Sequence, residues 1–120
     1  MFILMIAPPG RMRDSWHVLL RAADMVTTVV HADDGAQGLQ IVAQHPGAWI
    51  LLDSSLEDDA WQTLAQLRSA WPHARCQVVV YRAAQAEKAA ALGAHGIIPS
   101  DCSLEKLEAA LRKLQADKPV

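Results

Sequence analysis

The chain has 120 residues, 52% of them hydrophobic, and a formal net charge of −2. This length suits one domain whose core needs no disulfide or metal, and the hydrophobic content excludes a disordered chain. The small net charge gives no reason to expect direct binding to nucleic acid or to a membrane surface. Two cysteines without close metal-ligand spacing and a short N-terminal apolar run, unsuited to a signal peptide or membrane span, lead us to expect a cytoplasmic protein.

Apolar runs and amphipathic segments alternate in the first part of the chain. Residues 2–7 form an apolar run that ends at two prolines, which predicts a short strand. Apolar residues then recur with helical spacing, which predicts a helix over 12–23. The β-branched run 25–31 predicts a second strand, and a second helix is expected over 35–44.

The stretch 48–56 is distinctive because apolar residues run directly into one carboxylate, Asp53. No polar residue alternates with them, which is typical of an inner strand of a parallel sheet with both faces covered. Open parallel sheets bind their ligands at the carboxyl ends of their strands. Asp53 is therefore a candidate functional residue, and the alternative is that it only begins a loop.

Cap and stop signals divide the rest of the chain. Acidic residues before an apolar stripe favour a helix start, and proline or glycine favours an end. The expected elements are a helix that begins near Asp58 and Asp59 and ends before Pro72, a strand over 77–81, a helix over 84–92, a strand over 95–99 and a helix after the N-cap Ser103.

Five alternations of strand and helix predict an α/β fold. We expect a flavodoxin-like (βα)5 doubly wound parallel sheet of order 2-1-3-4-5, with the first and fifth helices on one face and the other three on the opposite face. Residues 1–120 are expected to form a single domain, with 115–120 as a tail or the start of a linker. The expected core includes Leu19, Leu20, Val29, Ile50, Leu51, Val79, Ile97, Leu107 and Leu111.

Several short motifs occur in a specific order along the chain. They are Ala32-Asp33-Asp34-Gly35-Ala36, His45-Pro46 followed by Trp49-Ile50-Leu51-Leu52-Asp53, Ala91-Leu92-Gly93-Ala94-His95-Gly96-Ile97-Ile98, and Asp101-Cys102-Ser103-Leu104-Glu105-Lys106-Leu107. Together they make the chain resemble, over essentially its full length, the receiver domain of bacterial two-component response regulators. The last motif resembles the subfamily that usually carries a helix-turn-helix output domain.

The resemblance implies a phosphorylation site from which four of five groups are missing. A working receiver uses two acidic residues to hold Mg²⁺, an aspartate that accepts the phosphoryl group, a threonine or serine, and a lysine. Asp53 matches the phosphoacceptor. The acidic pair falls on Ala7 and Pro8, the hydroxyl on Tyr81 and the lysine on Ser100. We therefore expect no Mg²⁺ site and no other cofactor.

Three function hypotheses follow. The first is a pseudo-receiver, not an enzyme, that acts through protein contacts with a histidine kinase, an output domain or a second copy, without direct contact to nucleic acid or membrane. The second is a receiver phosphorylated at Asp53 by unusual groups, which regulates an output such as a DNA-binding domain. The third is a flavodoxin-like small-ligand binder, disfavoured because no glycine-rich phosphate loop follows the first strand.

Some residues have two interpretations. Tyr81 either fills the space left by metal and phosphate or stands on the surface for a partner. Arg82 or Arg11 either replaces the lysine or is solvated, and solvation is the more common outcome. The acidic run Glu57, Asp58 and Asp59 either adds to a cation site or caps a helix, and capping is favoured. The histidines His17, His31, His45, His73 and His95 look scattered, with no metal-ligand spacing.

Overall fold

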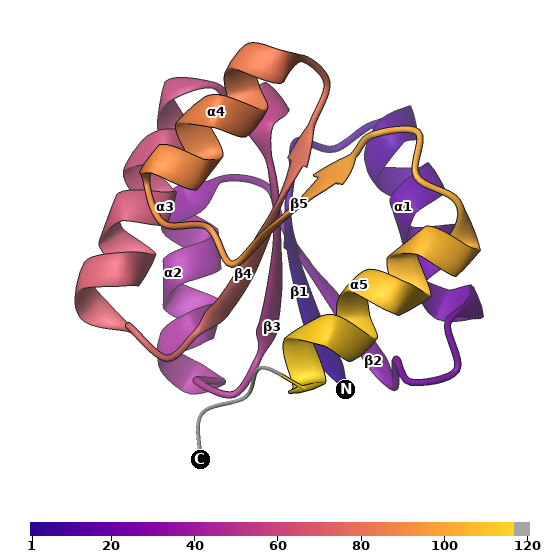
Figure 1. The fold of residues 1–120 in the computed structure, drawn as a ribbon. Helices are drawn as coiled ribbons and strands as arrows, with labels where there is room; N and C mark the ends of the chain where they lie inside the picture. Colours follow the sequence, from indigo (N-terminus) through magenta and orange to yellow (C-terminus); the bar gives the residue numbers. More distant parts are fainter. Residues whose placement is uncertain (117–120) are drawn as a thin grey trace.

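The computed structural model describes residues 1–116, in which five strands alternate with five α-helices and one short 3₁₀ helix (Figure 1). The elements are β1 (Phe2–Ile6), α1 (Arg11–Ala22), β2 (Thr28–Ala32), α2 (Gly35–Gln44), β3 (Trp49–Asp53), η1 (Ser54–Leu56), α3 (Asp58–Ala70), β4 (Arg75–Val80), α4 (Ala83–Ala91), β5 (Gly96–Pro99) and α5 (Leu104–Ala116). No helix in this described part is both long and apolar enough to span a membrane.

The strands form one parallel sheet in the order β2-β1-β3-β4-β5, as the sequence predicts. β3 lies between β1 and β4, so both of its edges are hydrogen-bonded. The register pairs Asp53 with Val79 at the carboxyl end of this inner strand. The chain switches direction across the sheet between β1 and β3, which is where open α/β sheets form their ligand crevices.

Two apolar cores lie on opposite faces of the sheet. Alternate residues of each strand point to opposite faces, so Leu4 and Ile6 join one core while Ile3 and Met5 join the other. Helices α2, α3 and α4 cover the first face, and α1 and α5 cover the second (Figure 1). This arrangement confirms the predicted distribution of helices.

Helix α2 packs so closely against the sheet and against α3 that two of its positions require glycine. A Cβ on Gly38 would collide with Ile6 of β1, and one on Gly35 would collide with Thr63 of α3. Asp34 caps α2 by accepting a hydrogen bond from the Gln37 N–H at 2.9 Å. The start of α2 is thereby held near the carboxyl edge of β1.

Some predicted boundaries and burial assignments differ from the structure. β2 begins at Thr28 rather than at residue 25, because residues 23–26 turn out of α1, with the Val26 N–H bonded to the Ala23 carbonyl. Helix α5 includes Gln115 and Ala116, which were expected in the tail, while residues 117–120 lie outside the described part. Ser103 does cap α5, through its hydroxyl and the Lys106 N–H at 3.2 Å.

Most of the expected core residues are buried, but Ile97 is not. Leu20, Ile50, Leu51, Val79, Leu107 and Leu111 are buried, and Leu19 and Val29 are half-buried. Ile97 is 38% exposed, so the prediction of its burial is wrong. It lies on the edge strand β5, paired with Val78 on the α4 side, and α4 leaves it open to solvent, whereas the neighbouring Ile98 faces the α1–α5 core.

Candidate functional site at the carboxyl edge

Asp53 is buried at the end of β3, and both of its carboxylate oxygens accept hydrogen bonds. The residue is only 1% exposed. Oδ1 accepts from the Ser55 backbone N–H at 2.9 Å, which is the cap of the 3₁₀ helix η1. Oδ2 accepts from the Tyr81 hydroxyl at 3.0 Å. A buried carboxylate needs such donors, because desolvation of an unpaired charge is costly.

Tyr81 follows β4 and reaches across the carboxyl edge to Asp53. Burial raises the pKa of the Tyr81 hydroxyl to about 12, and the negative charge and the accepting oxygen of Asp53 add to this effect, while Ser55 opposes it. The tyrosine therefore stays a neutral proton donor at physiological pH. The sequence left two placements open, and the structure shows features of both: the hydroxyl is bonded to the buried Asp53, while the residue as a whole is 37% exposed.

The β4–α4 loop that carries Tyr81 is held from its other side by Gln85. The Gln85 Oε1 accepts from the Tyr81 N–H at 2.7 Å and from the Arg82 N–H at 3.1 Å. Gln85 is the third residue of α4 and forms the reciprocal half of a capping box. Sequence reasoning missed this residue, because a glutamine three residues after the N-cap is only half of the capping-box signal and the N-cap here is Arg82 rather than serine or threonine.

A guanidinium group, not a carboxylate, lies beside the end of β1. The Ala7 N–H bonds to the Ala32 carbonyl at 3.0 Å, and the Ala7 carbonyl accepts from Arg13 Nη1 at 3.3 Å. The same nitrogen forms an ion pair with Asp33 at 2.6 Å. Arg11 and Arg82, the two arginines that the sequence suggests as replacements for the lysine, are both exposed, and Arg13 is not among these candidates. No local motif marks Arg13, because its partners belong to other elements.

The acidic residues after Asp53 make helix-end and interhelical contacts. Asp58 and Asp59 lie in the first turn of α3, where negative charge is favourable. Asp59 Oδ2 also accepts from the Gly35 N–H at 2.9 Å and so joins α3 to α2. Within residues 1–116, no group of three or more histidine, cysteine, aspartate or glutamate residues is placed to hold a metal ion. The two aspartates match the favourable first-turn charge expected from the sequence, but among the described residues the N-cap residue Glu57 makes no side-chain cap hydrogen bond, so capping in the strict sense is not observed.

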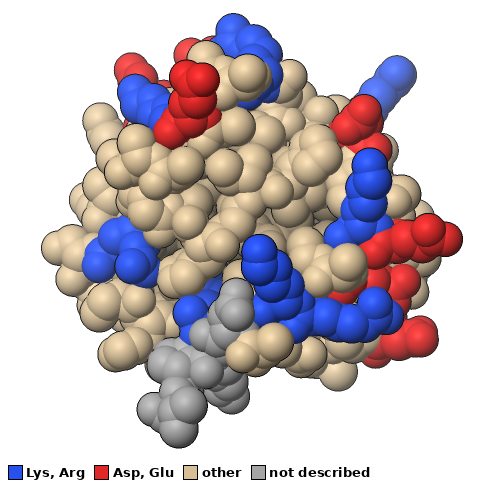
Figure 2. All heavy atoms as spheres, in the orientation of Figure 1, with Lys and Arg blue, Asp and Glu red and all other residues tan. Residues whose placement is uncertain are grey.

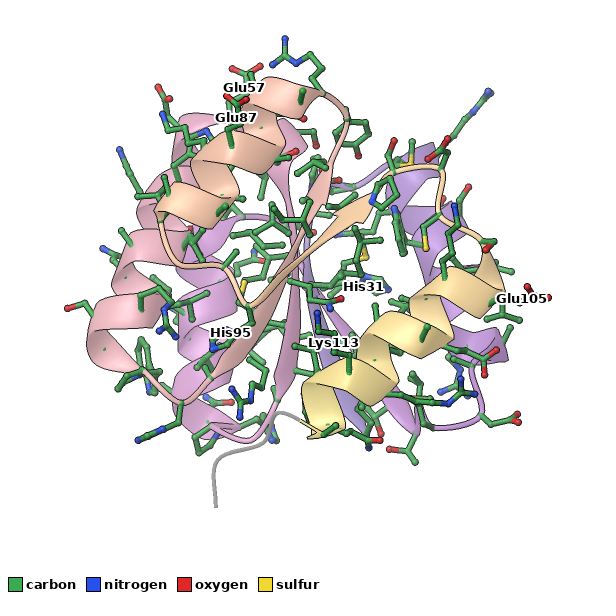
Figure 3. All side chains as sticks on the ribbon, viewed as in Figure 1. His31, Glu57, Glu87, His95, Glu105 and Lys113 are labelled. Carbon is green, nitrogen blue, oxygen red and sulfur yellow. The ribbon has the colours of Figure 1, made fainter. Side chains whose placement is uncertain are left out.

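Three further positions complete the description of this edge. Glu57, labelled in Figure 3, is a non-glycine residue with φ of 57°, a left-handed conformation at the start of α3. Ser100 follows β5 and donates its backbone N–H to the Val80 carbonyl at 2.9 Å. With Tyr81 it lines an open hollow of about 340 Å³ between the β4–α4 and β5–α5 loops. Pro8, the last of the predicted positions, is half-buried next to Ala7.

Two histidines that look unrelated in the sequence meet on the α1 side of the sheet. His17 Nδ1 and His31 Nε2 are 2.7 Å apart, a contact that their spacing in the sequence does not indicate. His95, labelled at the opposite end of the sheet in Figure 3, accepts from the Cys76 N–H and lies against Arg68.

The comparisons with known proteins identify structures but no sequence relatives. No protein-family model and no curated protein matches the sequence. The signal receiver domain of the response regulator NarL from Mycobacterium tuberculosis is 22% identical, with a TM-score of 0.83, over 98% of this chain and 97% of that one. A two-component response regulator of the LuxR family from Aurantimonas sp. SI85-9A1 is 18% identical, with a TM-score of 0.85, over 98% and 86%.

A third similar structure is the chemotaxis response regulator CheY4 of Vibrio cholerae, 17% identical with a TM-score of 0.78, over 94% of this chain and 97% of that one. At these identities the likeness establishes the fold alone. The strand order, the two layers of helices and the agreement over almost the whole chain lead to one conclusion: this protein has the flavodoxin-like fold of response regulator receiver domains.

Proposed function

We propose that this protein is a pseudo-receiver: a receiver-type signalling domain of a two-component system that acts through protein contacts, without Mg²⁺-dependent phosphorylation of Asp53. The fold supports the receiver part of the proposal. The hydrogen bond from the Tyr81 hydroxyl to the buried Asp53 supports the rest. In this proposal the tyrosine occupies the place where the phosphoryl chemistry of a working receiver would take place.

The residues at the edge do not fit a magnesium ion. Mg²⁺ prefers oxygen ligands in octahedral geometry, and neither Ala7 nor Pro8 has a side-chain oxygen. The Ala7 carbonyl already accepts from Arg13, and both oxygens of Asp53 already accept from protein donors. A carboxylate that attacks a phosphate needs nearby cations to offset the converging negative charge. Asp53 would have to lose the Tyr81 bond and react without a metal.

The surface formed by α4, β5 and α5 is the proposed contact face for a protein partner. Figure 2 shows this face, with uncharged atoms across its middle and charged groups toward its edges. Ile97 and Tyr81 are exposed there, and Tyr81 also lines the open hollow between the two loops. Helix α5 adds the mixed charges Glu105, Glu108, Arg112 and Lys113, of which Glu108 and Arg112 form an ion pair at 3.7 Å.

The partner on this face is proposed to be a histidine kinase, an output domain or a second copy of the chain. Light scattering at high protein concentration separates the last case from the first two. An Ile97→Arg variant places a charge on an exposed apolar residue of β5 and should abolish self-association if it occurs through this face. Val18→Arg on the exposed outer surface of α1 is the matched control, because Val18 is 70% exposed on another side of the protein.

Incubation with acetyl phosphate and Mg²⁺, followed by intact-mass spectrometry, tests the phosphorylation part. We expect no mass gain, because the missing divalent ion and lysine would contribute several kcal/mol in the transition state, and about 1.4 kcal/mol corresponds to a tenfold change in rate. A gain of one phosphoryl group that disappears in Asp53→Asn would instead support a receiver that is switched at Asp53 by unusual groups.

A rebuilt site tests the assignment of the four altered positions. The variant with Ala7→Asp, Pro8→Asp, Tyr81→Thr and Ser100→Lys restores the carboxylates, the small hydroxyl and the lysine of a working receiver. We expect it to bind Mg²⁺ in a calorimetric titration while the parent protein does not. A rebuilt protein that folds and still ignores Mg²⁺ would show that these positions are not the equivalents of the receiver site.

A further inference from the structure

The histidine pair joins the first helix to the edge strand of the sheet. His17 lies in α1 and His31 in β2, and their ring centroids are 4.9 Å apart with Nδ1 and Nε2 at 2.7 Å. Both side chains are half-buried, and Figure 3 shows His31 on the side of the sheet that α1 and α5 cover. His31 Nδ1 is buried and has no hydrogen-bond partner within residues 1–116, so among these residues the bond to His17 is the polar contact of that ring.

The hydrogen-bond chemistry of two imidazoles limits how many protons this contact tolerates. In the neutral pair one nitrogen carries the shared hydrogen and the other offers its lone pair. A first added proton gives one imidazolium that donates to one neutral imidazole, so the bond survives. A second added proton puts a hydrogen on both His17 Nδ1 and His31 Nε2. Two N–H groups cannot face each other at 2.7 Å, so the rings must separate.

The surroundings of His31 lower its pKa, so the second proton binds only at a lower pH. Burial lowers the pKa of His31, and the positive charges of Arg13 and His17 lower it further, while Asp14 and Asp33 act in the opposite direction. Arg21, one turn after His17, is bonded to the Thr27 carbonyl. Helix α2 and strand β1 have no charged residues in their sequences. Helix α5 covers the same face as α1 and carries charged residues, but none of them is among the groups that act on His31, which are those of α1 and Asp33 in the loop after β2.

We propose that His17 and His31 form an acid-sensitive latch between α1 and β2, closed at neutral pH and opened when both rings are protonated. The latch lies beside the Arg13–Asp33 ion pair, and Arg13 also bonds to the Ala7 carbonyl. Two imidazoliums next to this guanidinium repel it. Opening therefore loosens the start of α1 from the carboxyl edge. This inference does not depend on whether Asp53 is phosphorylated.

The direction of the pH effect follows from the folded and unfolded forms. His31 has its ordinary pKa of 6.5 when unfolded and a lower pKa when folded. Protons therefore bind the unfolded chain more readily, and the stabilising contribution is complete above about pH 6.5 and is lost as the pH falls below it. Each extra proton bound by the unfolded state lowers the folding equilibrium constant by about tenfold per pH unit.

A nitrogen-detected NMR titration of the imidazole rings in the wild-type chain, with a chelator present, is the direct test. We expect the resonances of His17 and His31 to respond to each other, with His31 protonated below the ordinary histidine range. Titration of His31 at the ordinary histidine value, without any response of its resonances to His17, would overturn the proposal. This measurement needs no variant, so it decides the question even if a substitution prevents folding.

Urea unfolding at several pH values between about 7.5 and 5 tests the consequence for stability. In His17→Gln the amide can donate to neutral His31 through its nitrogen or accept from protonated His31 through its oxygen, so the contact tolerates both states. We expect wild type to lose up to about tenfold more of its folding constant per pH unit than this variant. His73→Gln is the control, because His73 is exposed, and it should behave as wild type. Equal pH dependence in wild type and His17→Gln would contradict the latch.

Discussion

The two halves of the carboxyl edge are closed by different interactions. On the β3–β4 half, a neutral hydroxyl donates to a buried carboxylate, Tyr81 to Asp53. On the β1–β2 half, a guanidinium pairs with a carboxylate that is 50% exposed, Arg13 with Asp33. Water and salt screen the second contact. The first contact has a neutral donor and an acceptor residue that is only 1% exposed, although Tyr81 itself is 37% exposed. The comparison indicates that the β3–β4 half is fixed by the fold, whereas solution conditions can change the β1–β2 half.

The apolar strands beneath both halves should contribute more to the free energy of unfolding than either of these polar contacts. Leu52, the residue before Asp53, is fully buried and paired with Ile6 of β1. We expect Leu52→Ala to lower the free energy of unfolding by about 2–5 kcal/mol, because it removes packing and leaves a cavity. Urea unfolding measures this loss, and Val18→Ala on the exposed surface should change stability by less than about 0.5 kcal/mol. A small loss of unfolding free energy for Leu52→Ala would contradict the prediction that packing between β1 and β3 holds the two halves of the edge together.

Removal of the tyrosine hydroxyl should have the next largest effect. Tyr81→Phe keeps the ring but leaves Asp53 Oδ2 buried without its donor, which should cost about 1–3 kcal/mol of unfolding free energy. A double-mutant cycle with Asp53→Asn isolates the pair from other effects of each substitution. We expect the loss to be nearly independent of salt. A Tyr81→Phe protein as stable as wild type would remove the distinction between the two halves.

Alkaline titration should report the same contact in the unmodified protein. Tyr81 is the single tyrosine of the chain, so the ultraviolet absorbance of tyrosinate reads this residue alone. Its pKa of about 12 lies above the ordinary 10.0, so the stability it contributes is complete below pH 10 and is lost as the pH rises through the folded value. Asp53→Asn removes the carboxylate charge and should lower the pKa of Tyr81. No change in that variant would contradict the contact.

The ion pair on the other half should give the smallest effect. Arg13→Gln is expected to lower the free energy of unfolding by less than about 1 kcal/mol in dilute buffer, and the difference should shrink in high salt because the pair is screened. Asp33→Asn is the matched substitution at the partner residue and should behave alike. A loss for Arg13→Gln that equals the loss for Tyr81→Phe and persists in salt would show that both halves are equally fixed.

The sequence by itself determined the elements of the fold and the position of Asp53. The alternation of apolar runs and amphipathic stripes is local, and each element follows from residues within its own segment, as in helix α2, predicted over 35–44 and observed there. The parallel order follows because short connections between alternating strands and helices leave few other arrangements. Asp53 lies at the carboxyl end of β3 because the apolar run that predicts this strand ends at that residue.

The tertiary structure alone decided which side chains meet. Tyr81 and Asp53 are 28 residues apart, Arg13 and Asp33 are 20 apart, and His17 and His31 are 14 apart, each pair on different elements. No local pattern encodes such pairs, because they depend on strand register, helix placement and side-chain rotamers. The exposure of Ile97 has the same origin, since the position of α4 over β5, and not the apolar character of the residue, determines whether it is covered.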